Sequence, residues 1–239
     1  MILLTACGGG NAVAPVGKHT QSNKAKVTQT KAPSFHKVKK GDTLYSISWR
    51  YGMNYKTLAK INNIRSPYKI YIGQKLRFKP TKTTQNNYKK KATTSKKITN
   101  KKVVKKTTSS TRPVNTSVAW RWPTKGKVIS TYSKSAAGRK GIDIAGKSGQ
   151  QVVSSAAGKV VYSGNGLARY GNLLIIKHND VYLSAYAHNK KLLVKDGQYV
   201  KAGQKIATLG RTGTQRDQLH FEIRRNGKPI DPMQFLPKR

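Results

Sequence analysis

One stretch of the chain limits the possible folds more than any other. Residues 80–117 consist mainly of lysine, threonine and serine and contain no acidic residue. Such a segment has too few large apolar side chains to offset the entropy of ordering, and its like charges repel one another. We therefore expect residues 80–117 to be a disordered basic linker, which divides the chain of 239 residues into two small folded domains.

The N-terminal residues predict an anchor and a tether. Cys7 follows Leu-Thr-Ala and precedes three glycines, which resembles a bacterial lipobox, the signal for lipidation of a cysteine. Residues 1–7 are then a truncated lipoprotein signal, and Cys7 is the lipidation site that attaches the chain to a membrane. The alternative is an ordinary free cysteine. Residues 8–34 are small and polar, and we expect them to form a disordered tether.

The charge of the chain bears on its partners. Lysine and arginine number 48 against 7 acidic residues, which gives a formal net charge of +41. Much of this charge lies in the low-complexity segments, and neither folded segment resembles a nucleic-acid-binding fold. We therefore expect polyanionic surfaces such as the cell wall or membrane phosphates as partners, and no nucleic acid.

Residues 35–79 predict a small β-α-α-β domain. Asp42 or Thr43 can cap a first helix, and Asn54 can cap a second one. Lys37–Lys39 and Lys75–Phe78 are expected to pair as strands. Apolar side chains recur at helical spacing between these strands: Leu44, Ile47 and Tyr51, then Tyr55, Leu58 and Ile61. We expect His36, just before the first strand, to be exposed to solvent.

The same segment carries the motif "GDTLYSIS", followed by "YG", "LAKIN" and "IGQKL". This pattern resembles the LysM module, which binds glycans that contain N-acetylglucosamine, chiefly peptidoglycan and chitin. The resemblance implies a shallow groove between the first loop and the loop after the second helix. The alternative is a structural domain without a ligand. The implied glycan-binding residues are Gly41, Asp42, Thr43, Leu44, Asn63, Ile64 and Tyr68.

Residues 118–239 predict a mainly antiparallel β domain. Short apolar runs alternate with glycine turns, for example "GIDIAG", "GKVVYSG", "NLLIIKH" and "GQKIATLG", and no long helical pattern occurs. In "VYLSAYAH" the two-residue period of a strand places Tyr186 and His188 on one face. In "QLHFEI" it places Gln218, His220 and Glu222 together on one face.

The second domain resembles the LytM (lysostaphin-like) zinc endopeptidases, which cut peptidoglycan cross-bridges. The resemblance runs through "GRKGIDIAG", "YGN", "YAHN" and "LHFEI". Active members hold zinc with a His-x-x-x-Asp loop and the last His of a His-x-His strand, and two further histidines act in catalysis. By position, Asp143 and His220 match metal ligands and His188 matches a catalytic residue. Arg139 replaces the first ligand, and Gln218 replaces the other catalytic histidine.

These two replacements predict a domain without zinc and without hydrolytic activity. A catalytic zinc site uses three protein ligands and a water, and the guanidinium of Arg139 has no lone pair to donate. A cation about 4 Å from the metal would cost roughly 8 kcal/mol at an effective dielectric constant near 20. Gln218 cannot exchange a proton near neutral pH. We therefore expect no cofactor and a pseudoenzyme.

A LysM module, a degenerate LytM domain and a lipobox together resemble the NlpD-type lipoproteins of Gram-negative bacteria. The resemblance implies an outer-membrane lipoprotein that faces the periplasm, binds peptidoglycan and activates N-acetylmuramyl-L-alanine amidases, so that septal peptidoglycan is split and daughter cells separate. The alternatives are an active zinc metalloendopeptidase that cleaves peptidoglycan peptide cross-links and a purely structural wall-binding lipoprotein. The expected amidase-binding cleft consists of Arg139, Lys140, Asp143, His188, Gln218 and His220.

Overall fold

The structure of the chain is a computed structural model. It describes residues 33–80, 117–135 and 139–238. Cys7, the segment 1–7, almost all of the expected tether and almost all of the expected linker lie outside the described residues, so those expectations stay predictions.

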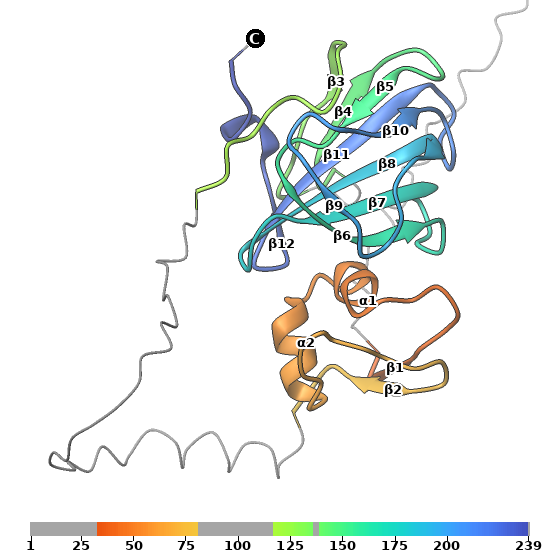
Figure 1. Cartoon of the computed structure of the whole chain (residues 1–239), viewed down its shortest axis with the longest axis vertical. Coiled ribbons are helices and arrows are strands. Elements are labelled where there is room, and N and C mark those ends of the chain that lie inside the picture. Colours follow the sequence, from red (N-terminus) through yellow and green to blue (C-terminus); the bar gives the residue numbers. More distant parts are fainter. Residues whose placement is uncertain (1–32, 81–116, 136–138, 239) are drawn as a thin grey trace, which may run out of the picture. The chain divides into compact units, whose positions relative to one another are not determined.

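The N-terminal domain contains the expected β-α-α-β order (Figure 1). Its elements are β1 (Phe35–Lys37), α1 (Leu44–Arg50), α2 (Tyr55–Ile61) and β2 (Lys75–Arg77). Thr43 caps α1: its hydroxyl accepts from the backbone N–H of Ser46, and the Ser46 side chain accepts in return from the N–H of Thr43. Asn54 caps α2 through a single bond, in which its side-chain oxygen accepts from Lys56 N–H. Both predicted caps are confirmed.

The strands of this domain differ from the expected ones at three boundaries, and one residue is unexpectedly buried. β1 begins and ends two residues earlier than expected, because Phe35 pairs with Arg77 and His36 pairs with Leu76, and β2 ends one residue earlier, at Arg77. His36 is therefore buried, so the prediction that it is exposed is wrong. Its Nε2 lies 2.8 Å from Oδ2 of Asp42 and its Nδ1 lies 3.2 Å from the hydroxyl of Tyr51. These polar partners make burial of the ring possible.

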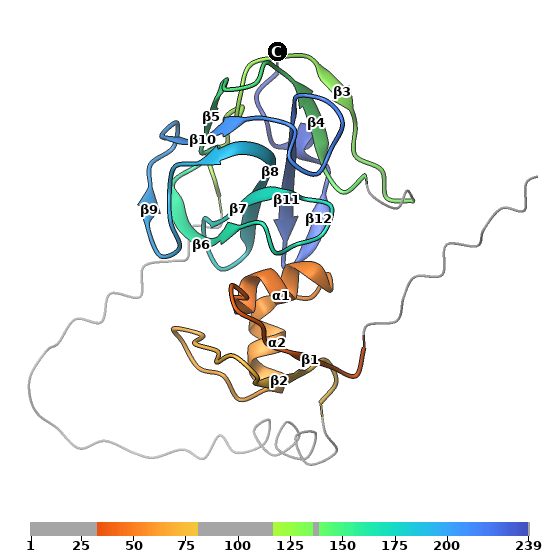
Figure 2. The ribbon, with the colours of Figure 1, turned by 90° about the vertical axis from the view of Figure 1, so that its right-hand side faces the viewer.

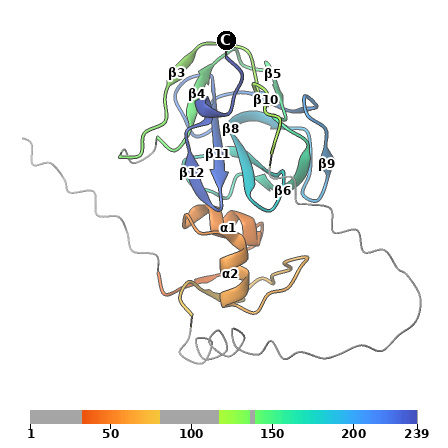
Figure 3. The ribbon, with the colours of Figure 1, turned by 90° about the vertical axis from the view of Figure 1, so that its left-hand side faces the viewer.

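The C-terminal domain is an antiparallel β structure, as predicted (Figures 1 and 2). Its strands pair in the order β3-β4-β11-β8-β7-β6-β9, while β10 pairs with β5 and β8, and β12 pairs with β11. β12 lies beside β11 in Figure 3. The sequence patterns did not indicate the short strands β9 and β12. The elements are β3 (Val128–Ser130), β4 (Ile142–Ala145), β5 (Gln151–Val153), β6 (Gly158–Gly164), β7 (Asn172–Lys177), β8 (Tyr182–Leu192), β9 (Tyr199–Val200), β10 (Lys205–Leu209), β11 (Gln218–Arg225), β12 (Lys228–Ile230) and the 3₁₀ turn η1 (Pro232–Gln234).

The two faces of β11 and β8 have different roles. Leu219, Phe221 and Ile223 of β11 point into the main apolar core, together with Tyr186 of β8. The alternate residues of β11 face the other side of the sheet, where His220 pairs with Ala187 of β8. The alternation predicted for "QLHFEI" is therefore confirmed, and it places the polar side chains of β11 on a single face.

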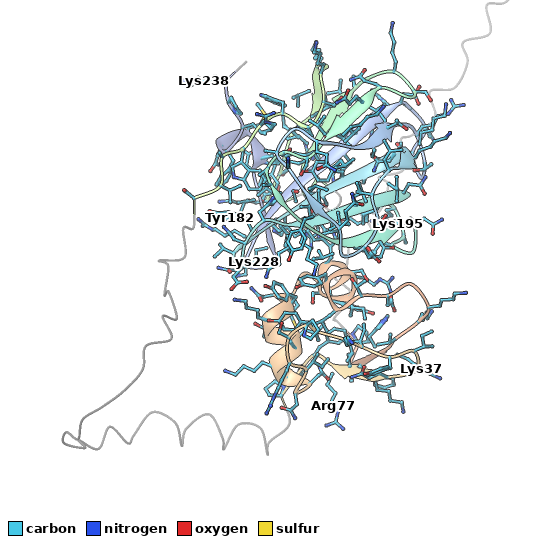
Figure 4. All side chains as sticks on the ribbon, in the orientation of Figure 1. Lys37, Arg77, Tyr182, Lys195, Lys228 and Lys238 are labelled. Carbon is cyan, nitrogen blue, oxygen red and sulfur yellow. The ribbon has the colours of Figure 1, made fainter. Side chains whose placement is uncertain are left out.

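The surface of both domains is rich in lysine. Figure 4 shows Lys37, Lys195, Lys228 and Lys238 extending outward from the ribbon, and all of them are exposed. Among the helices of the described residues, none has the length and apolar character needed to cross a membrane.

A half-buried histidine makes the stability of the C-terminal domain depend on pH. Nδ1 of His178 lies 2.8 Å from the carbonyl oxygen of Ala157, and Nε2 lies 2.7 Å from Oγ of Ser184. A carbonyl oxygen only accepts, so in the neutral ring Nδ1 carries the proton and Nε2 faces the Ser184 hydroxyl. Burial lowers the pKa of His178 to about 4.

We expect the free energy of unfolding to decrease by up to about 3 kcal/mol as the pH falls from 6.5 to 4. In this range the unfolded chain binds a proton at His178 and the folded chain does not, whereas above pH 6.5 both forms are neutral. Urea unfolding of the wild type and of His178→Gln at pH 7.0 and pH 4.5 measures the effect. The variant should lose less stability on acidification, and equal losses would contradict the prediction.

Candidate functional site

The candidate site is a cleft at the ends of β4, β8 and β11 in the C-terminal domain. A pocket of about 380 Å³ opens there. From this domain it is lined by Lys140, Asp143, Leu167, Ala168, Arg169, Tyr170, His188, His220 and Arg224. Most of these side chains are charged or can donate hydrogen bonds, which suits the binding of a polar, acidic surface better than an apolar ligand.

A glycine lets the loop of "GRKGIDIAG" reach the site. β4 pairs with β11 in the register that places Asp143 opposite His220. A Cβ atom at Gly141 would collide with the carbonyl oxygen of Phe221 on β11. Only glycine allows this approach of the two backbones, and Asp143 two residues later is thereby brought against His220.

Alternating charges run along the polar face of β11. Oδ1 of Asp143 lies 2.6 Å from Nδ1 of His220, and Nε2 of His220 lies 3.2 Å from Oε1 of Glu222. Oε2 of Glu222 accepts from Nε of Arg224 at 2.9 Å. Glu222 is fully buried and Arg224 is 2% exposed. Each buried charge is thus neutralised by a hydrogen-bonded partner of opposite sign, as burial requires.

The geometry makes His220 a cation. Both of its ring nitrogens face carboxylates, which only accept hydrogen bonds when ionised, so both nitrogens carry a proton. Burial by itself would lower the pKa of His220, but the bonds to Asp143 and Glu222 outweigh it and raise that pKa. Burial would likewise raise the pKa of Glu222, whereas Arg224 and His220 lower it, so Glu222 stays ionised.

Two further side chains complete the cleft. The hydroxyl of Tyr170 donates to Oε1 of Glu222 at 2.7 Å, and burial raises the pKa of Tyr170. Nδ1 of His188 donates to the carbonyl oxygen of Thr212 at 2.8 Å, which leaves Nε2 as a free acceptor in the neutral ring. The rings of His188 and His220 lie 6.0 Å apart between centroids.

The position of His188 corrects the face assigned to it from the sequence. Strict alternation along β8 places His188 with Tyr186, which points into the main core. Instead, the pairing of β7 with β8 shifts in register near this point, and His188 has a φ of 64°. The resulting bulge moves the His188 ring to the opposite face, beside His220. The prediction from the two-residue period, that His188 shares a face with Tyr186, is therefore wrong.

The structure brings together only four of the six residues that the sequence predicted to form the amidase-binding cleft. Lys140, Asp143, His188 and His220 line one pocket. Arg139 is exposed and is not among the residues that line it. Gln218 is buried at the start of β11 and does not line the pocket either.

The residues present do not fit the zinc site of an active peptidase. Asp143 and His220 bind each other directly, and the second nitrogen of His220 is taken by Glu222. The side chain of Arg139 offers no lone pair. In the described part of the chain, no group of three or more His, Cys, Asp or Glu residues has an arrangement that could hold a metal ion. A catalytic zinc uses three protein ligands, and of the three ligand positions inferred from the sequence only those of Asp143 and His220 carry side chains that can bind zinc.

Only some of the residues implied for glycan binding line a common pocket. Asp42, Thr43, Leu44 and Tyr68 line a second pocket of about 300 Å³. The Leu44 side chain is 1% exposed and belongs to the core of the N-terminal domain, so this residue can offer a ligand only its backbone. Gly41, Asn63 and Ile64 are not among the residues that line this pocket.

Five residues of the C-terminal domain that line the cleft were not predicted from the sequence, and three of them have polar or charged side chains: Arg169, Tyr170 and Arg224. Arg224 extends the polar face of β11 by one more step of the two-residue period, which was a usable signal. Arg169 and Tyr170 lie in an irregular loop before β7, where no periodicity applies. Arg169 has a φ of 73°, a conformation that sequence patterns do not predict for arginine.

Comparison with known proteins agrees with this architecture. Residues 36–79 match the LysM domain family, and residues 137–232 match Peptidase family M23. Among solved structures, a zinc-containing peptidase from Vibrio cholerae shares 37% identity with a TM-score of 0.45. That match covers 48% of this chain and 39% of the peptidase, so the chain spans well under two thirds of its length.

Relatives that match over most of the chain are named lipoproteins or murein hydrolase activators. The "Lipoprotein NlpD/LppB homolog" of Pseudomonas aeruginosa is 42% identical over 84% of this chain and 76% of its own length. The "Murein hydrolase activator NlpD" of Escherichia coli is 42% identical over 86% of this chain and 68% of its own length. The "Uncharacterized lipoprotein YgeR" of Escherichia coli is 44% identical over 90% and 86%, respectively. The chain therefore belongs to the NlpD/LppB family of lipoproteins, with a LysM domain followed by a domain of Peptidase family M23.

Proposed function

We propose that this protein is a pseudoenzyme that activates peptidoglycan amidases through the cleft of its C-terminal domain. The observation that carries the proposal is the direct ion pair between Asp143 and His220, which occupies the positions of two metal ligands. A third ligand position holds the exposed Arg139. The relatives named murein hydrolase activators support an activating role.

The other parts of the chain place the activator at the cell wall. The LysM domain binds glycan strands of peptidoglycan, through the loop Asp42–Leu44 and Tyr68. Lipidation of Cys7 attaches the chain to the outer membrane, on the periplasmic side. Relatives named lipoproteins and outer membrane antigenic lipoproteins support this location.

Activation requires that the cleft discriminates between two states of the amidase. A ligand shifts an equilibrium only through a difference in its affinity for the two states. The rim of the cleft supplies Lys140 and Arg169, while His220 adds a buried positive charge that Asp143 and Glu222 compensate. An acidic segment that the amidase exposes only in its active state fits this surface.

A dye-release assay on purified sacculi tests the proposal. We expect no release by the protein alone, slow release by a purified periplasmic N-acetylmuramyl-L-alanine amidase, and at least about a tenfold faster release by the mixture, a shift of about 1.4 kcal/mol in the amidase equilibrium. Release by the protein alone, with cleaved peptide cross-links, would instead identify an endopeptidase. A mixture no faster than the amidase would leave a structural wall-binding role.

A further inference from the structure

Trp49 lies on helix α1 of the LysM domain, yet it packs outside the core of that domain. Its side chain is 3% exposed. The other buried members of its apolar cluster belong to the C-terminal domain and include Val161, Leu173, Ala185 and Ala187; Tyr45 of the LysM domain packs against this cluster. The LysM core is a separate cluster around Leu44 and Ile47. Both domains belong to one packing unit, Ala32–Arg239. Trp49 is therefore an anchor between two domains and has little part in folding its own.

The anchor contacts the charged network of the cleft. The guanidinium of Arg224 lies 3.5 Å from the centroid of the Trp49 ring, and its Nη1 donates to the carbonyl oxygen of Trp49 at 2.8 Å. The next residue, Arg50, donates to the carbonyl oxygen of Gly166 at 3.0 Å. Trp49 and Arg50 also line the same pocket as Lys140, Asp143 and His220. Helix α1 thus forms one wall of the cleft.

A second contact uses the loop expected to bind glycan. The hydroxyl of Thr43 donates to the carbonyl oxygen of Val161 on β6 at 3.1 Å. This hydroxyl has one proton, so it cannot donate to a sugar at the same time. Lys159 and Val161 of β6 also line the pocket that contains Thr43 and Tyr68. A glycan strand entering this groove therefore competes with β6 for the same loop.

We propose that docking of α1 closes the cleft and that binding of a glycan rich in N-acetylglucosamine to the LysM loop opens it. The proposal rests on the proposed function, since it concerns access of the amidase to the same cleft. In the closed form, Trp49 and Arg50 occupy space that the partner needs. Linkage is reciprocal: a glycan that favours the open form raises amidase affinity, and a bound amidase raises glycan affinity by the same factor.

The contact has a size suited to a switch. It contains the packing of Trp49 in the apolar cluster of the C-terminal domain, its stack with Arg224, a few hydrogen bonds and an ion pair between Lys56 and Asp180 at 2.9 Å. That ion pair is about half exposed and contributes little. Because both partners belong to one chain, a weak contact can still be populated. If the open form is about one tenth of the molecules, apparent amidase affinity falls about tenfold.

Two variants of the full chain test the proposal, each through a different contact. Trp49→Lys places a cation against Arg224, and it leaves the LysM core intact because Trp49 is not part of it. Lys56→Glu places a carboxylate against Asp180. Lys79→Glu is the matched control, since this exposed lysine is outside this set of contacts. Small-angle X-ray scattering reports docking, and titration with purified amidase reports affinity, each with and without a β-1,4-linked N-acetylglucosamine tetramer.

We expect Trp49→Lys to have a larger radius of gyration than the wild type and to bind amidase about tenfold more tightly. Lys56→Glu acts on the weaker, exposed ion pair, so it should change both quantities in the same direction by a smaller amount. The tetramer should expand the wild type and raise its amidase affinity, with no further effect on Trp49→Lys. The proposal is overturned if undocking leaves amidase affinity unchanged, or if the tetramer leaves the wild type compact. An expanded variant that binds no amidase at all would refute the proposed function, while the tetramer-induced expansion would still establish the glycan-sensitive contact.

Discussion

Glu222→Gln is expected to lower the free energy of unfolding of the C-terminal domain by about 3 to 5 kcal/mol. The side chain keeps its size and loses its charge. Glu222 is fully buried and accepts from His220, Arg224 and Tyr170. Without its charge, the guanidinium of Arg224 and the imidazolium of His220 remain in a buried site with too little negative charge. Removing one partner of a buried ion pair is costly for this reason.

Urea unfolding monitored by circular dichroism at pH 7 measures this loss. Asp217→Asn is the matched control, because Asp217 directly precedes β11 and forms no ion pair within the described residues. The control should change the stability by no more than about 0.5 kcal/mol. If the free energy of unfolding of Glu222→Gln is less than about 1 kcal/mol below that of the wild type, the ion pairs of Glu222 with His220 and Arg224 do not stabilise the domain as we describe.

Lys140→Glu is expected to reduce amidase activation at least about tenfold in the sacculus assay. Lys140 lines the cleft near Asp143 and Arg169, so the change reverses a charge that a partner would meet directly. Like charges placed opposite one another across an interface can cost several kcal/mol. The remaining activation should also respond less to salt than that of the wild type, because fewer attractive charges steer the encounter.

Reversing the charge of Arg139 tests which set of residues forms the amidase-binding cleft: the set expected from the sequence, which includes Arg139, or the set that lines the pocket in the structure, which does not. Arg139 is exposed and does not line the pocket, so Arg139→Glu should have a smaller effect than Lys140→Glu. The double variant Lys201→Glu and Lys205→Glu controls for net charge, since both lysines are exposed and neither lines the cleft. Equal losses in all these variants would show that total charge matters and that the cleft does not.

The sequence by itself determined the division into domains and the type of each domain. Residue spacing fixes which side chains can share a face: the period of two along "QLHFEI" places His220 with Glu222, and helical spacing places Leu44 with Ile47. Caps such as Thr43 and Asn54 are also local, because their hydrogen bonds reach only two or three residues along the chain. The sequence also excludes Arg139 as a metal ligand, because a guanidinium group has no lone pair to donate.

Only the tertiary structure decided how distant residues meet. The bulge that turns His188 toward His220 depends on the register of β7 and β8, which no local pattern encodes. The ion pair of Asp143 with His220 joins positions 77 residues apart. The burial of Trp49 against the other domain follows from contacts across an even longer stretch of chain. Local preferences select strands and helices, but register and docking depend on the packing of many side chains at once, and that packing forms only in the folded chain.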